Sequence, residues 1–167
     1  IEEAYVPATL PAQRSTGIKK NTDRIVEEKD FVDPAAAVYK IPEFAPLGRA
    51  FRSSSEVALT ENEMEYVVTC TKHIFENHVI LQFSVLNTID DHKLQNVIVN
   101  VETDEEAYVV EKNIPAPFAR YGEPSCCFVS LSEVGNPVPC SMSCELHFKV
   151  LQVDPTTGDI EGDEDGY

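Results

Sequence analysis

Residues 139–153 constrain the fold of this chain more than any other segment, because apolar and polar side chains alternate along them. Side chains on a β-strand point to opposite faces with a period of two, so one face is apolar and the other is hydrated. A helix would need apolar residues at three- and four-residue steps, which this run lacks. The apolar face needs a second sheet, so the segment predicts a β-sandwich. Its apolar positions are Cys140, Met142, Cys144, Leu146, Phe148 and Val150.

Similar short runs continue between residues 63 and 153, separated by turn signals at spacings of about ten residues. Strands are expected over residues 63–71, 78–87, 94–102, 107–112 and 125–131, and turns over residues 72–78, 88–93 and 134–137. Residues 114–124 hold three prolines and are expected to form a loop, because proline cannot donate to the ladder of a central strand. The pattern predicts an all-β fold, an antiparallel immunoglobulin-like β-sandwich. No tryptophan is present, which disfavours an antibody-like domain.

The chain divides into three parts by composition. Residues 1–55 carry five prolines and equal numbers of acids and bases, eight of each, and are expected to form a long, largely irregular linker. Short helical patches are expected within it at residues 21–33 and 34–39. Residues 56–153 form the expected sandwich, and residues 154–167 form an acidic tail.

Two groups of residues are candidates for contacts with other proteins. Phe44, Leu47 and Phe51 lie in or beside a stretch with apolar residues set between prolines. They would anchor the linker either on a neighbouring protein or on the sandwich itself. Phe118, Arg120 and Tyr121 lie in the proline-rich loop, and exposed aromatic residues beside arginine are typical of binding hot spots. The competing interpretation is that Phe118 and Tyr121 plug the end of the core.

The formal net charge of −16 is concentrated in the sandwich and the tail. Residues 56–153 hold fifteen acids and five bases, and residues 154–167 hold six acids and no base. Phosphate contacts need lysine and arginine, so non-specific binding to nucleic acid is disfavoured, and an anionic membrane surface would repel this part. No apolar run reaches the roughly eighteen residues that a membrane span needs. Basic protein partners fit the charge better.

The search for reactive chemistry finds no phosphate loop, no nucleophile elbow and no metal-ligand spacing among the four histidines. We interpret His73, His78, His92 and His147 as solvated or locally hydrogen-bonded. Cys140 and Cys144 would lie about 13 Å apart along a strand, too far for a disulfide. Adjacent Cys126 and Cys127 would point to opposite faces. Four or five of the thiols are therefore expected to be packing residues in a reducing compartment. Neither enzymatic activity nor a cofactor nor a metal is expected.

Residues 53–167 resemble the gamma subunit family of coatomer, the coat of COPI vesicles. The resemblance is carried by the strings SSSEVALTE (53–61), EYVVTCTKH (65–73), QF (82–83), NT (87–88), LQNV (94–97), DPTTG (154–158) and DGY (165–167). Residues 41–51 resemble the family's approach to the same domain more weakly.

The resemblance implies the appendage, or ear, of gamma coatomer: an immunoglobulin-like sandwich leading to a platform subdomain expected after residue 167. It implies a coat subunit fragment that acts in Golgi-to-ER and intra-Golgi transport and recruits accessory or regulatory proteins. The implied partners are other coatomer subunits and, at the level of the whole coat, an Arf GTPase and its GTPase-activating protein. The implied location is cytoplasmic and peripheral on Golgi membranes and COPI vesicles. The alternative is a passive spacer that supports the platform.

Overall fold

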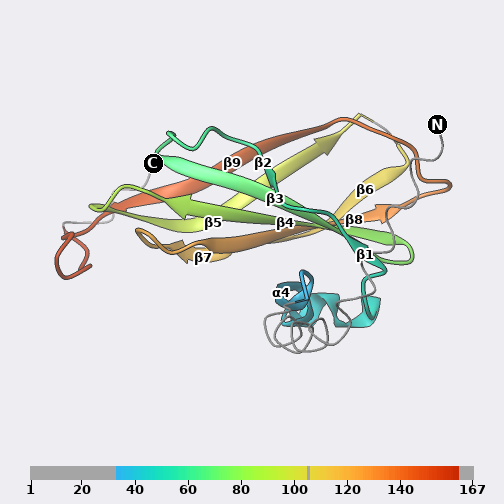
Figure 1. The fold of residues 1–167 in the computed structure, drawn as a ribbon, viewed down its shortest axis with the longest axis horizontal. Coiled ribbons are helices and arrows are strands. Elements are labelled where there is room, and N and C mark those ends of the chain that lie inside the picture. Colours follow the sequence, from blue (N-terminus) through green and yellow to red (C-terminus); the bar gives the residue numbers. More distant parts are fainter. Residues whose placement is uncertain (1–32, 105, 162–167) are drawn as a thin grey trace, which may run out of the picture. The chain divides into compact units, whose positions relative to one another are not determined.

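The computed structural model describes residues 33–104 and 106–161, and the chain divides into two compact units, residues 1–36 and residues 37–167. The described part of the second unit contains nine strands in two antiparallel sheets (Figure 1), which confirms the predicted all-β sandwich. The immunoglobulin-like connectivity stays a prediction. The helical patch expected at residues 21–33 lies outside the described residues, apart from Asp33.

The larger sheet has six strands in the order β1-β3-β4-β8-β6, with β2 also paired to β3, and the smaller sheet has the order β7-β5-β9. The first strands are β1 (Arg52–Ser53), β2 (Val57–Ala58), β3 (Tyr66–Ile74), β4 (His78–Asn87) and β5 (His92–Thr103). They are followed by β6 (Tyr108–Ile114), β7 (Ala116–Ala119), β8 (Ser125–Glu133) and β9 (Met142–Gln152).

The main core lies between the two sheets and follows the predicted alternation. Strand β4 alone contributes Val79, Leu81, Phe83 and Val85, all buried. The smaller sheet faces them with buried Leu94, Val97, Val99 and Val101 from β5 and with half-buried Leu146, Phe148 and Val150 from β9. The segment that predicted the sandwich thus supplies part of its core, although the strand begins at Met142 rather than at Pro139.

Strand β5 contains a bulge that the alternation alone does not reveal. Leu94 and Val97 both face the core although they are three residues apart. The register against β9 shifts between Gln95 and Ile98, and Asn96 in this interval has a φ of 55°. Left-handed backbone is a conformation that asparagine tolerates better than most residues. The extra residue therefore restores the inward direction of the side chains after Leu94.

The outer face of the larger sheet is covered by part of the expected linker. Helix α4 (Ala36–Tyr39) and the 3₁₀ helix η1 (Pro42–Leu47) precede the strands, and α4 confirms the helical patch expected at residues 34–39. Val38 and Phe44 are buried in a second cluster with Phe75, Ile80 and Phe128. The Phe44 and Phe128 rings meet edge to face at 6.1 Å between centroids. Residues 37–50 are thus packed on the sandwich rather than forming an irregular linker.

His73 is hydrogen-bonded rather than solvated, and it lies in a strand rather than in the turn expected at residues 72–78. This side chain is fully buried in β3. Its Nε2 lies 2.8 Å from the Gln82 Oε1, which is an acceptor, so Nε2 donates and the Ser53 hydroxyl donates to Nδ1 over 2.7 Å. This arrangement ties β1 to β3 and β4 through side chains as well as through the ladder.

Two expected boundaries are also wrong. Residues 72–74, expected to be a turn, continue strand β3, and the turn follows at residues 75–77. The expected loop at residues 114–124 contains strand β7, which pairs with β5 at the edge of the smaller sheet. Proline is tolerated on an edge strand because no second neighbour needs its missing donor, so the argument against a central strand still holds. Within the described part of the chain, no helix is long and apolar enough to cross a membrane.

Candidate functional site at the end of the sandwich

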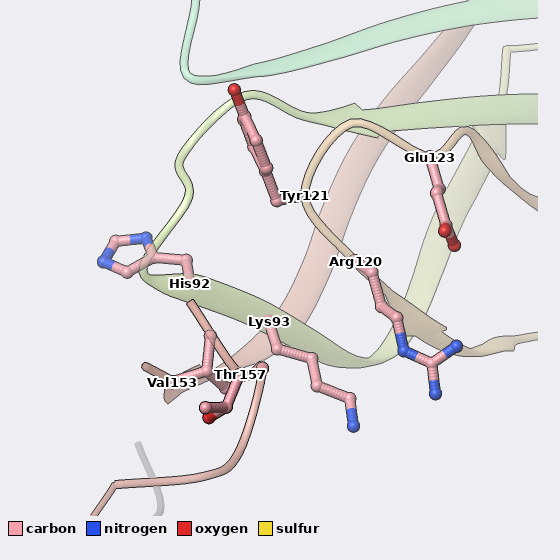
Figure 2. Close-up of a pocket in the computed structure, with 8 residues that line it drawn as sticks. His92, Lys93, Arg120, Tyr121, Glu123, Val153 and Thr157 are labelled. Atoms are coloured by element: carbon pink, nitrogen blue, oxygen red, sulfur yellow. The ribbon is translucent and has the colours of Figure 1, made fainter. Parts of the chain in front are cut away.

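A surface hollow of about 370 Å³ lies where β5 begins and the chain leaves β7 and β9. Figure 2 shows its lining, which comes from three separate stretches of chain. The lining residues are His92 and Lys93, Arg120, Tyr121 and Glu123, and Val153, Thr157 and Gly158. Two of the predicted contact residues, Arg120 and Tyr121, therefore share one site.

Buried Asn87 holds two of these stretches in place. Its amide nitrogen donates to the His92 carbonyl oxygen at 2.7 Å, which fixes the start of β5. Its backbone carbonyl accepts from the Gly122 N–H at 2.9 Å, and it forms a bridge with Tyr121. Gly122 has a φ of 75°, a conformation that favours glycine. The loop that presents Arg120 and Tyr121 is therefore fixed at its base.

Phe118, the third predicted residue, lies next to the hollow on β7. The Lys93 ammonium lies 4.1 Å from the centroid of its ring, within the range of a cation–π contact. Phe118 is 38% exposed and Tyr121 is 56% exposed. Neither ring plugs the end of the core, so the competing interpretation of these two residues is wrong.

The hollow carries two cationic side chains, Lys93 and Arg120. Among the described residues, no carboxylate oxygen lies within 4.0 Å of the side-chain nitrogens of Lys93 or Arg120. In Figure 2 both side chains extend away from Tyr121 toward the same side of the view. Glu123 also lines the hollow, but its carboxylate oxygens lie more than 4.0 Å from the Arg120 side-chain nitrogens. The site can therefore offer positive charge to a ligand.

The other three predicted residues lie elsewhere. Phe44 is the buried residue of η1, and Leu47 is half-buried against the same cluster. Phe51 is 73% exposed, and its backbone N–H donates to the Ile74 carbonyl oxygen at 2.8 Å. Of the two readings left open for this group, Phe44 follows the one in which the segment packs on its own domain. Phe51 alone of the three presents a largely exposed ring.

Sequence reasoning missed Lys93 and Asn87 as parts of the site. The spacing of Lys93 from Phe118 along the chain gives no sign that β5 and β7 are paired. The signal that was available is charge, because residues 56–153 contain only five bases alongside fifteen acids. Each of the few basic residues in this acidic segment is therefore a candidate for a specific contact.

The cysteines form no metal site among the described residues, where no group of three or more potential ligands occurs. None of the five cysteines forms a disulfide. Cys127 faces the core between the sheets, whereas Cys126 packs on the outer cluster, as expected for adjacent residues of a strand. Cys144 is exposed and lines an apolar slot of about 270 Å³ between the edges of the two sheets, so its side chain is not a core residue.

Comparison with known proteins decides the family. The family model for the coatomer gamma subunit appendage platform subdomain matches residues 33–167. The chain belongs to the coatomer gamma subunit family. It is 40% identical over 163 residues to coatomer subunit gamma-1 of Mus musculus, and the alignment covers 94% of this chain and 18% of the mouse protein.

Two further gamma coatomer relatives agree. Coatomer subunit gamma-1 of Homo sapiens is 47% identical over 133 residues, which cover 76% of this chain and 15% of the human protein. Coatomer subunit gamma of Dictyostelium discoideum is 42% identical over 137 residues, which cover 80% of this chain and 15% of the Dictyostelium protein. The chain thus spans less than a fifth of the length of these relatives.

The gamma coatomer match also bears on the expected division of the appendage. The matching model is described as the platform subdomain, whereas we expected a platform only after residue 167. The match begins at residue 33 and so takes in α4 and η1, which were assigned to the linker. The boundaries at residues 55 and 153 stay predictions.

Proposed function

We propose that this chain is a non-enzymatic appendage module of the COPI coat that gathers accessory or regulatory proteins. The proposal places it in Golgi-to-ER and intra-Golgi transport, in the cytoplasm and peripherally on Golgi membranes. Its partners would be other coatomer subunits and, through the whole coat, an Arf GTPase and its GTPase-activating protein. Family membership supports the assignment to the coat.

The observation that carries the docking role is the exposed aromatic and cationic surface of the hollow. Tyr121 and Phe118 keep apolar ring surface in water, and Arg120 and Lys93 lack carboxylate partners among the described residues. Tyrosine and arginine dominate binding energy at protein interfaces. Contacts of this size give affinities in roughly the micromolar range, which suit a coat that must assemble and disassemble.

The test compares two exposed aromatic side chains in the whole chain. Tyr121→Ala removes a ring from the hollow, and Phe51→Ala removes an even more exposed ring at β1. Immobilised protein is used to retain purified candidate accessory proteins of the coat. We expect Tyr121→Ala to weaken retention about fivefold or more. Phe51→Ala should leave it unchanged, and the melting temperature should stay within about 2 °C in both, as for surface substitutions.

A passive spacer is the second candidate. The packing of residues 37–50 on the outer face of the larger sheet favours it, because this cover adds a buried cluster to the sandwich. A spacer would retain none of the accessory proteins in the same assay. Equal retention by the wild type, Tyr121→Ala and Phe51→Ala would also contradict the docking site proposed above.

A further inference from the structure

Positive charge gathers at one end of an otherwise acidic sandwich. Of the five bases in residues 56–153, Lys93 and Arg120 line the hollow. A third, Lys149, pairs with Gln95, and Gln95 pairs on its other side with Phe118. Lys149, Gln95 and Phe118 therefore form a row across the smaller sheet at the level of the hollow. We call the hollow together with this row the basic–aromatic end.

Among the described residues, none of the five bases in residues 56–153 has a carboxylate at ion-pair distance, so the cations of this end are distinguished by their position rather than by lacking a partner. Lys149, like Lys93 and Arg120, has none within 4.0 Å among the described residues. Three of the five bases in residues 56–153 gather at this one end. Three clustered cations beside an exposed ring match the chemistry of a ligand that brings its own carboxylates.

Size and long-range charge narrow the class of ligand. The hollow is at the small end of the range for ligand pockets, roughly 300–1,000 Å³, so it takes a single side chain rather than a folded partner. Extended polyanionic surfaces, such as nucleic acid or an anionic membrane, would be repelled by the rest of the protein, because the chain as a whole has a net charge of −16. A short acidic segment can place its charge at the three cations, although Glu123 also lines the hollow.

The site is also fixed before any ligand arrives. Asn87 is fully buried and joins the start of β5 to the loop carrying Arg120 and Tyr121, through the 2.7 Å and 2.9 Å hydrogen bonds described above. Lys93 is held over the Phe118 ring. Less conformational freedom is lost on binding when the residues of a site are already positioned.

We propose that the basic–aromatic end binds an extended acidic peptide segment that carries an aromatic side chain. The aromatic side chain enters the hollow beside Tyr121, and flanking carboxylates pair with Lys93, Arg120 and Lys149. This inference rests on the proposed docking function and names the partner's chemistry.

The experiment measures binding of a fluorescein-labelled peptide of about twelve residues, in which aspartates flank one phenylalanine, to the whole chain by fluorescence anisotropy. We expect a dissociation constant on the order of tens of micromolar that weakens about tenfold between roughly 0.05 M and 0.5 M salt. Replacing the peptide's phenylalanine by alanine, or its aspartates by lysine, should each abolish measurable binding.

A matched pair of variants locates the site. Arg120→Glu and Lys72→Glu change the net charge by the same amount, but Lys72 is an exposed residue of β3 that does not line the hollow. We expect about a tenfold or greater loss of peptide affinity for Arg120→Glu and less than a twofold loss for Lys72→Glu. Arg120→Gln replaces Arg120→Glu if the latter lowers the melting temperature.

Three results would overturn the inference: no peptide binding by the wild type, equal losses in the two variants, or binding to vesicles of anionic lipid in place of the peptide. Retention of accessory proteins by Arg120→Glu as strong as by the wild type would refute the acidic-peptide site while leaving the docking function standing. If the wild type neither binds the peptide nor retains the accessory proteins, both the acidic-peptide site and the docking function are refuted.

Discussion

At the scale of single residues, the thiols between the sheets show how burial changes chemistry. Cys127 is fully buried in the main core, and burial raises its pKa to about 12. Cys70 packs against the same core, and burial, together with nearby Cys144, raises its pKa to about 11. Both thiols therefore stay protonated and act as small apolar side chains, as the sequence predicted for them.

These raised pKa values predict a loss of stability at alkaline pH. In the unfolded chain the thiols ionise near their ordinary value of 9, whereas in the folded chain they keep their protons. The folded state then binds more protons, so the free energy of unfolding is fully present below about pH 9 and falls as the pH rises toward 11 and 12. The slope should approach about 1.4 kcal/mol per pH unit for each thiol.

Urea unfolding at about pH 8, 9 and 10 measures this slope, before most lysines and tyrosines titrate. Cys127→Ala serves as the comparison, since it lowers stability at every pH but removes one of the two titrating groups. We expect its curve to be flatter than that of the wild type. An equally steep curve would assign the alkaline loss to other groups.

At the scale of elements, the bulge in β5 sets which side chains of the smaller sheet reach the core. With Asn96 in the left-handed region, Leu94 before it and Val97 after it both face inward. In a regular strand, Leu94 and Val97 would lie on opposite faces of the sheet because they are three residues apart. Asn96 is therefore expected to be important for its backbone rather than for its exposed side chain.

We predict that Asn96→Val lowers the free energy of unfolding by about 1–2 kcal/mol, because a β-branched residue is strained at positive φ. Asn96→Gly should stay within about 0.5 kcal/mol of the wild type, since glycine adopts this backbone freely. Asn100→Val is the matched control, an exposed asparagine of the same strand, and should be nearly neutral. Chemical denaturation checks all three, and equal losses in Asn96→Val and Asn96→Gly would argue against backbone strain.

Most elements of this fold could be predicted from the period of two, because it depends only on which face is buried. The alternation predicted β4 and the inward residues Val97, Val99 and Val101. It missed β7, whose four residues include a proline and show no alternation, with Ala116 and Ala119 buried and the two residues between them exposed. It also ended β3 too early, because Lys72 and buried His73 look like turn residues in the sequence.

At the scale of the whole molecule, the candidate site was only partly predictable, because it is made by strands that are distant in sequence. The residues Phe118, Arg120 and Tyr121 are local in the chain, and their composition alone marked them. Lys93 and Asn87 reach the same place through the pairing of β5 with β7 and the turn after β4. No local pattern reports such pairing, so these two residues appear only in the structure.

The cover on the outer face gives the same lesson for Phe44. Apolar residues between prolines predicted an anchor but not its target, and the target is the cluster with Ile80 and Phe128. The partly apolar second face of β4 was the sequence signal for some cover there. Phe44 and Ile80 are 36 residues apart in the sequence, and neither residue identifies the other as its packing partner.

We predict that Phe44→Ala releases residues 37–50 from the sandwich. Replacing a buried phenylalanine by alanine typically costs about 3–5 kcal/mol, and a short segment can detach locally instead of unfolding the whole domain. Trypsin should then cleave rapidly after exposed Lys40 and Arg49, while the strands remain intact. Phe51→Ala, which removes a ring that is 73% exposed, should be cleaved at the wild-type rate. If Phe44→Ala is as resistant as the wild type, the pairing of β1 with β3 and the bond between Ser53 and His73 are sufficient to hold the segment, and the buried ring is not its main anchor.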